Sequence, residues 1–123
     1  MTVNSGTSAL HAALIAHGIG NGDEVIVPSF SFISTANSVI FVQAKPVFAD
    51  IEEENYGLDP QSISGKITKN TKAVMPMDYS GQSCKIFEIK ESFKIITLSK
   101  SIDWLNLFKT SPHFIVISFT VPL

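Results

Sequence analysis

The chain has 123 residues and a formal net charge of −2; 45% of its residues are hydrophobic and only 16% are charged. This length suits one domain with a sizeable core, and the composition excludes a disordered chain. The weakly acidic balance gives no indication of nucleic acid as a partner. Cys84 is the single cysteine, so the sequence predicts neither an internal disulfide nor a metal site built from cysteines.

The first motif is a run of small polar residues, Asn4 to Ser8, ahead of a helix predicted over residues 9–17. The free N–H groups of a helix N-terminus attract anions, and Gly6, Thr7 and Ser8 would let a phosphate approach closely. Plain N-capping by a Ser or Thr hydroxyl explains the same residues without any ligand. Both interpretations are open on this stretch alone.

Strand and helix patterns alternate along the rest of the chain. Short β-branched runs predict strands at residues 24–27, 46–51, 71–77 and 94–98. Periodic or well-capped segments predict helices at residues 35–42, with Ala36, Val39, Ile40 and Phe41 facing inward, and at residues 59–67 and 85–93. This alternation predicts an α/β fold with a mostly parallel sheet that helices cover on both faces.

Three loops are candidates for a ligand site, because ligands of such sheets lie beyond the carboxyl ends of the strands. They span residues 5–8, 29–34 and 78–82. In the second loop, Phe30 and Phe32 either stack on a flat cofactor ring or belong to the core. In the third, Asp78 directly follows an apolar strand, although a role in a turn explains it as well.

Five segments of the chain resemble the DegT/StrS-type sugar aminotransferases, in the family's order and without a large gap. They are NSGTSALHAAL at 4–14, GIGNGDEVIVPSFSFISTANSV at 18–39, KPVFADIEEENYGLDP at 45–60, ITKNTKAVMPMDYSGQ at 67–82 and CKIFEI at 84–89. The resemblance covers about Val3 to Ile89. It implies part of the large domain of type I pyridoxal-phosphate-dependent transferases, a three-layer αβα fold.

The resemblance also implies two sets of site residues. Those that match the positions holding the phosphate and stacking on the pyridine ring of pyridoxal 5'-phosphate are Gly6, Thr7, Ser8 and Phe32. Those that match segments lining the cofactor and sugar pocket are Ser29, Asn37, Asp78 and Tyr79. Enzymes of this family move an amino group, usually from glutamate, onto a nucleotide-linked keto sugar. They act as homodimers, and their products feed polysaccharide, glycan or antibiotic biosynthesis.

The match fades after about Glu91. The family continues with a strand ending in an acidic pair, whose aspartate supports the pyridinium nitrogen, but Ser99-Lys100-Ser101 stands in that place. The family's Schiff-base lysine follows a serine–aromatic segment; Ile117-Ser118-Phe119 echoes it faintly, with no lysine after it. We therefore expect residues 1–98 to form a partial transferase domain. We expect residues 99–123 to be a divergent tail, of the kind found in a frameshifted or truncated gene product.

Two functions from different classes follow. The chain is either the cofactor-binding fragment of a sugar aminotransferase, inactive alone, or a non-catalytic α/β module. Such a module would bind a phosphate-bearing ligand or a full-length relative. The sequence opens without a signal-peptide pattern, and its apolar end, residues 114–123, is too short to span a bilayer. A cytoplasmic protein without a membrane partner is expected.

Overall fold

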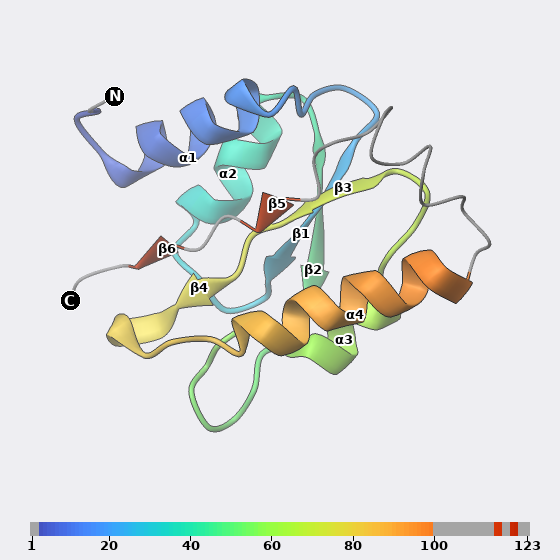
Figure 1. Cartoon of the computed structure of the whole chain (residues 1–123). Coiled ribbons are helices and arrows are strands. Elements are labelled where there is room, and N and C mark those ends of the chain that lie inside the picture. Colours follow the sequence, from blue (N-terminus) through green and yellow to red (C-terminus); the bar gives the residue numbers. More distant parts are fainter. Residues whose placement is uncertain (1–2, 100–114, 117–118, 121–123) are drawn as a thin grey trace.

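The structure is a computed structural model that describes residues 3–99, 115–116 and 119–120 (Figure 1). Its elements, in chain order, are α1 (Gly6–Ala16), β1 (Glu24–Pro28), α2 (Ser34–Phe41), β2 (Lys45–Ala49), α3 (Pro60–Ser64), β3 (Thr71–Val74), β4 (Met77–Asp78), the 3-10 turn η1 (Tyr79–Gly81), α4 (Ile86–Ser99), β5 (Ile115–Val116) and β6 (Phe119–Thr120). None of the helices within these described ranges is long and apolar enough to cross a membrane.

The main sheet is parallel and has the strand order β2-β1-β3-β5. Val25 of β1 pairs with Pro46 of β2 and with Ala73 of β3, and Ala73 in turn pairs with Ile115 of β5. The short strands β4 and β6 form a second parallel pair. The predicted parallel sheet is confirmed. In the predicted tail, β5 and β6 are described, and its other residues from 100 onward lie outside the described part.

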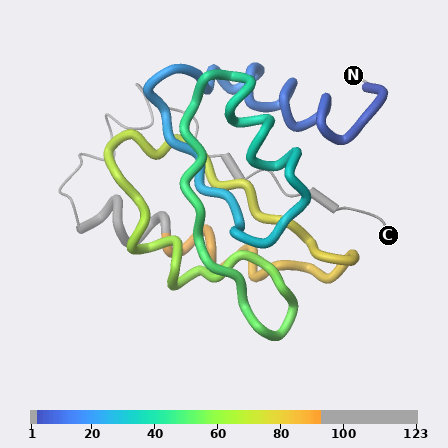
Figure 2. Tube along the Cα trace, turned by 180° about the vertical axis from the view of Figure 1, so that it is seen from behind, coloured from blue at the N-terminus to red at the C-terminus, as the bar shows by residue number. Residues whose placement is uncertain are grey.

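Helices cover both faces of the main sheet, with α1 and α2 on one face and α3 and α4 on the other (Figure 1). Val25 of β1 packs in one core with Leu14 of α1. Ile26, the next residue, packs in the other core with Ile63 of α3 and Ile89 of α4. Because side chains alternate along a strand, β1 serves both cores. The expected three-layer αβα arrangement is thus confirmed, and Figure 2 shows it from behind.

The strand predicted over residues 94–98 is wrong, because α4 continues through this segment to Ser99. The run Ile95-Ile96-Thr97 is β-branched and favours a strand locally. However, Ile86 and Ile89, on the turns before this run, lie at a helical spacing of three and pack in the same core. Ile89 is fully buried, so tertiary packing outweighs the local preference.

The single strand predicted over residues 71–77 is divided into β3 and β4. Pro76 lies between them and has no N–H with which to extend a ladder. Met75, just before it, still donates its N–H to the carbonyl of Ile26 at 2.8 Å. The division allows the chain to leave the main sheet at this point, and β4 pairs with β6 instead.

One helix boundary and the burial of two side chains also differ from the prediction. Helix α1 begins at Gly6 rather than at residue 9, because Ser5 serves as its N-cap. In α2, Val39 is buried as predicted, but the Ile40 and Phe41 side chains are 54% and 55% exposed, so the prediction that they face inward is wrong. The ring of Phe41 instead lies against His11 of α1, with the centroids 5.7 Å apart.

Candidate functional site

The N-terminus of α1 is organised by a network of side-chain caps. Ser5 has extended backbone angles, and its hydroxyl accepts the N–H of Ser8 at 3.1 Å. The Ser8 hydroxyl lies 2.9 Å from the Ser5 hydroxyl and donates to Oδ1 of Asn4 at 3.1 Å. Ser8 therefore holds the cap together, because its single hydroxyl proton is engaged within this network.

Two backbone donors remain directed out of the same helix end. The first bond in the helical pattern runs from the N–H of Ala9 to the carbonyl of Ser5, at 3.0 Å. The N–H groups of Gly6 and Thr7, which precede it, cannot have an acceptor inside the helix. No acidic residue occupies the first turn of α1. This end is therefore suited to an anion, with two amides and the half-buried Thr7 side chain as donors.

The loop from β1 to α2 presents aromatic and apolar side chains to the surface. Phe30 and Phe32 are 47% and 65% exposed, so their assignment to the core is excluded. The backbone between them is anchored by Ser31, whose hydroxyl lies 2.7 Å from Oγ1 of Thr35 and donates to the sulfur of Met77 at 3.3 Å. The loop can therefore hold aromatic faces in place beside a ligand.

The other predicted pocket residues lie on neighbouring segments. Ser29 is exposed in the same loop and donates its N–H to the carbonyl of Ala49 at 2.8 Å, while Asn37 is half-buried in α2. The N-terminal ends of α1 and α2, the strand β4 and η1 all lie on one side of the molecule (Figure 1). The three loops predicted from the sequence thus face the same side.

Asp78 has a structural bond that the sequence did not indicate. Its Oδ1 accepts the N–H of Cys84 at 2.9 Å, which closes the loop from β4 to α4. Within this loop, Gln82 donates its N–H to the carbonyl of Tyr79 at 2.9 Å. Asp78 therefore fixes the position of Tyr79, in addition to any contact of its own with a ligand.

Burial of Cys84, together with its hydrogen bond to Asp78 and the negative charge there, raises the pKa of the thiol to about 12. At neutral pH the thiol is therefore protonated and is neither a nucleophile nor a metal ligand. Beside it, Lys85 and Glu52 form an ion pair with Nζ and Oε2 3.0 Å apart, and this pairing raises the pKa of Lys85. The ion pair links the segment before α4 to the loop between β2 and α3.

Sequence reasoning missed Tyr56, which lies in the loop between β2 and α3. Three glutamates, Glu52 to Glu54, precede Tyr56, and such a run is typical of a solvated turn. The ring of Tyr56 contacts the rings of Phe30 and Tyr79. The signal that could have revealed it is the bulky residue between Asn55 and Gly57, where a tight turn is expected to carry only small residues.

The fold and these loops define a class: a parallel α/β unit with free backbone donors at a helix N-terminus and an aromatic loop at the carboxyl edge of its sheet. The sequence matches the DegT/DnrJ/EryC1/StrS aminotransferase family over residues 1–98. The chain therefore belongs to this family.

Curated relatives match this chain closely over part of their length. GDP-perosamine synthase of Caulobacter vibrioides is 49% identical over 88 residues, which cover 72% of this chain and 24% of the relative. The spore coat polysaccharide biosynthesis protein SpsC of Bacillus subtilis is 51% identical over 84 residues, 68% of this chain and 22% of the relative. The chain thus spans about a quarter of the length of these relatives.

Solved structures share its fold. DesV of S. venezuelae superimposes with a TM-score of 0.73 at 37% identity, over 76% of this chain and 25% of DesV. Spr1654 of Streptococcus pneumoniae, in its PLP form, gives a TM-score of 0.78 at 27% identity, over 94% of this chain and 29% of Spr1654. The fold described above therefore also occurs in sugar aminotransferases that bind pyridoxal 5'-phosphate (PLP).

Proposed function

We propose that this chain is the cofactor-binding part of an aminotransferase that moves an amino group from an amino acid, glutamate by preference, to a nucleotide-linked keto sugar. The observation that carries the proposal is the N-terminus of α1, where the amides of Gly6 and Thr7 lie outside the helical bonding pattern. Such an end fits the phosphate of pyridoxal 5'-phosphate. When bound, this cofactor supplies the electron sink that amino transfer requires.

Each residue that matches the family's cofactor site has a distinct role in this proposal. Gly6 and Thr7 donate to the phosphate, and Ser8 holds the helix end in shape through its bonds to Ser5 and Asn4. A phosphate at this end also competes for the Ser8 hydroxyl proton. Phe32, which is 65% exposed, covers one face of the pyridine ring.

The residues that match the family's cofactor and sugar pocket surround the sugar and the outer side of the cofactor. Ser29 offers its hydroxyl from the loop before α2, and Asn37 offers its amide from within α2. Asp78 and Tyr79 border the pocket from the loop after β4, where the bond to Cys84 keeps the loop closed. These four residues bind and orient the substrate.

We further propose that the 123-residue chain alone binds the cofactor reversibly and does not turn over. Amino transfer needs a lysine amine at the cofactor and a carboxylate at its ring nitrogen. The matched segments of this chain contain neither in the family's place. In the complete pocket, a second subunit of a homodimer contributes further groups; the exposure of Phe32 and Ile33, at 65% and 64%, leaves room for it.

The experiment is an absorbance titration of the chain with pyridoxal 5'-phosphate, followed by borohydride reduction and peptide mapping, and then an assay with glutamate and a keto sugar nucleotide. We expect saturable binding, no single labelled lysine and no product. Saturation that Thr7→Ala leaves unchanged would remove the phosphate site from the proposal. Labelling of one lysine with measurable amino transfer would show that the chain is a complete enzyme.

A further inference from the structure

Three aromatic rings from three different loops meet at the carboxyl edge of the sheet. The ring centroid of Tyr79 lies 5.3 Å from that of Phe30 and 5.5 Å from that of Tyr56, and the Phe30 and Tyr56 centroids are 6.1 Å apart. Their planes are tilted by 42° to 58°. The cluster therefore joins the loop after β1, the loop after β2 and the turn η1, although these are far apart in sequence.

The backbone at Tyr56 is unfavourable for a tyrosine. Its φ is 55°, in the left-handed region, which glycine and asparagine adopt readily but a bulky side chain does not. Strained residues of this kind gather at ligand sites, where the surrounding structure holds them. A tight turn alone would be better served by asparagine here, so the turn does not account for the aromatic ring.

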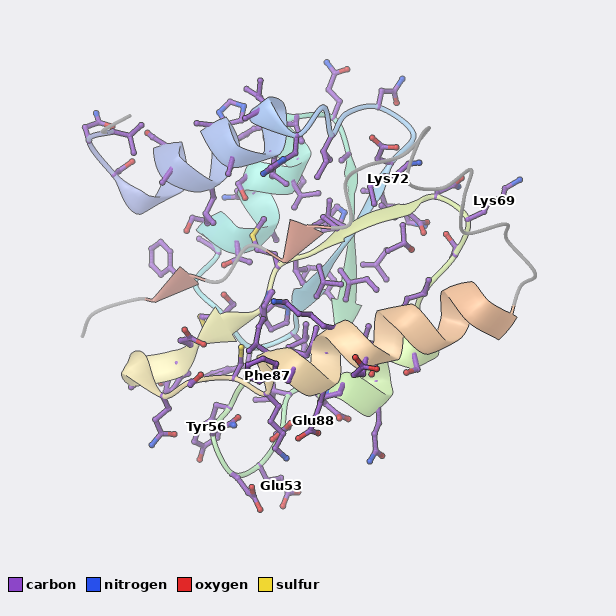
Figure 3. All side chains as sticks on the ribbon, viewed as in Figure 1. Glu53, Tyr56, Lys69, Lys72, Phe87 and Glu88 are labelled. Carbon is purple, nitrogen blue, oxygen red and sulfur yellow. The ribbon has the colours of Figure 1, made fainter. Side chains whose placement is uncertain are left out.

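The turn around Tyr56 is held rigidly. Oδ1 of Asn55 accepts the N–H of Gly57 at 2.7 Å. A Cβ atom at Gly57 would lie 2.8 Å from that Oδ1 and 3.1 Å from the Cβ of Cys84, so a larger residue would have to displace both neighbours. The loop thus packs against the segment that Asp78 fixes; in Figure 3, Glu53 is labelled at the outer end of this loop and Tyr56 nearer to the sheet.

The cluster is half open to solvent. Phe30 and Tyr56 are each 47% exposed, and Tyr79 is partly exposed. Rings that served only to pin the loops together would be expected to bury most of their surface. An open, rigid group of rings with two phenolic hydroxyls presents a flat face for stacking and polar groups for the edge of a heterocycle.

We propose that Phe30, Tyr56 and Tyr79 form a stacking site for the base of a nucleoside diphosphate, the part of a nucleotide-linked sugar that is remote from the reaction. This inference rests on the proposed function, because it assigns the nucleotide end of that substrate. It separates the two phenylalanines of one loop: Phe32 serves the cofactor and Phe30 serves the base. The cluster holds the substrate and takes no part in proton transfer.

The test uses the full 123-residue chain and two probes, UDP and GDP, with inorganic pyrophosphate as the ligand that lacks a base. Saturation-transfer NMR reports whether the base protons contact the protein, and calorimetry gives the dissociation constants. We compare the unmodified chain with Tyr56→Asn, Phe30→Leu and the control Phe41→Leu. Phe41 is a similarly exposed phenylalanine, at 55%, but lies against α1 instead.

Tyr56→Asn is informative because it removes the ring and keeps a residue that suits the turn. Asparagine tolerates the left-handed region, and this gain offsets the loss of two ring contacts, so the melting temperature should change little. We expect it to weaken binding of one or both nucleotides by about 5- to 150-fold, the equivalent of the 1–3 kcal/mol that a base–aromatic stack contributes. Phe30→Leu should weaken it similarly, and Phe41→Leu should leave it unchanged.

Three results would overturn the inference: no nucleotide binding, nucleotide binding no tighter than pyrophosphate binding, or equal affinity in Tyr56→Asn. Titration of the same variants with pyridoxal 5'-phosphate separates the two proposals. If the cofactor binds and the nucleotides do not, the stacking site fails alone. If the nucleotides bind through the cluster and the cofactor does not bind, the cofactor proposal fails and the stacking site stands.

Discussion

Replacing Thr7 with alanine should separate ligand binding from helix capping at the N-terminus of α1. The cap consists of the Ser5 hydroxyl on the N–H of Ser8 and the Ser8 hydroxyl on Asn4, and Thr7 takes no part in these bonds. The Thr7 hydroxyl is then available to a phosphate. A hydrogen bond to a charged group contributes about 1.5–3 kcal/mol, so Thr7→Ala should weaken pyridoxal phosphate binding by about 10- to 150-fold.

The matched variant is Ser5→Ala, which removes the cap and leaves the Thr7 hydroxyl in place. It should lower the free energy of unfolding by about 0.5–2 kcal/mol. Thr7→Ala should leave that free energy nearly unchanged, and Thr7→Ser, which keeps the hydroxyl, should restore most of the affinity. Absorbance titration gives the affinity and urea unfolding gives the stability. If Thr7→Ala lowered stability and left the affinity unchanged, the assignment of Thr7 to the ligand would be refuted.

Two further groups give independent predictions. Because the pKa of the Cys84 thiol is raised to about 12, Ellman's reagent should react slowly with the folded chain at pH 8 and rapidly in denaturant; Asp78→Asn should speed the reaction, since the Asp78 hydrogen bond and charge both raise that pKa. Hydrogen bonds from Thr68 and Lys45 lower the pKa of Glu24 in the folded state. Its contribution to stability is therefore present above about pH 4.3, the value for a free glutamate, and is lost as the pH falls through the lowered pKa. Glu24→Gln should flatten this acid-induced loss in pH-dependent unfolding curves, and an unchanged slope would contradict the role of Glu24.

The alternation of strand and helix patterns along the chain was enough to predict the layered parallel sheet, because the strands are short apolar runs that must be covered on both faces. The segment at residues 94–98 could not be predicted in the same way. Its β-branched residues favour a strand, while the burial of Ile89 on the preceding turns extends the helix. Only the packed structure shows which preference is satisfied.

The candidate site, too, could be predicted from the sequence only in part. The polar run at residues 4–8 indicated both a cap and an anion site, and the structure shows a cap with donors left over at Gly6 and Thr7. The loop with Phe30 and Phe32 was recognised as a candidate, but its partner Tyr56 was not. Contacts between loops depend on the tertiary fold, and no periodic pattern in a sequence records them.

The most direct measurement of the central claim is the change in backbone amide NMR shifts when pyridoxal 5'-phosphate is added to the ¹⁵N-labelled chain. The claim is that the phosphate binds at the N-terminus of α1. The largest changes should therefore fall on the amides of Gly6, Thr7 and Ser8, should saturate, and should be reduced by Thr7→Ala. Changes confined to amides beside surface lysines, with Gly6 and Thr7 unaffected at saturation, would contradict the claim.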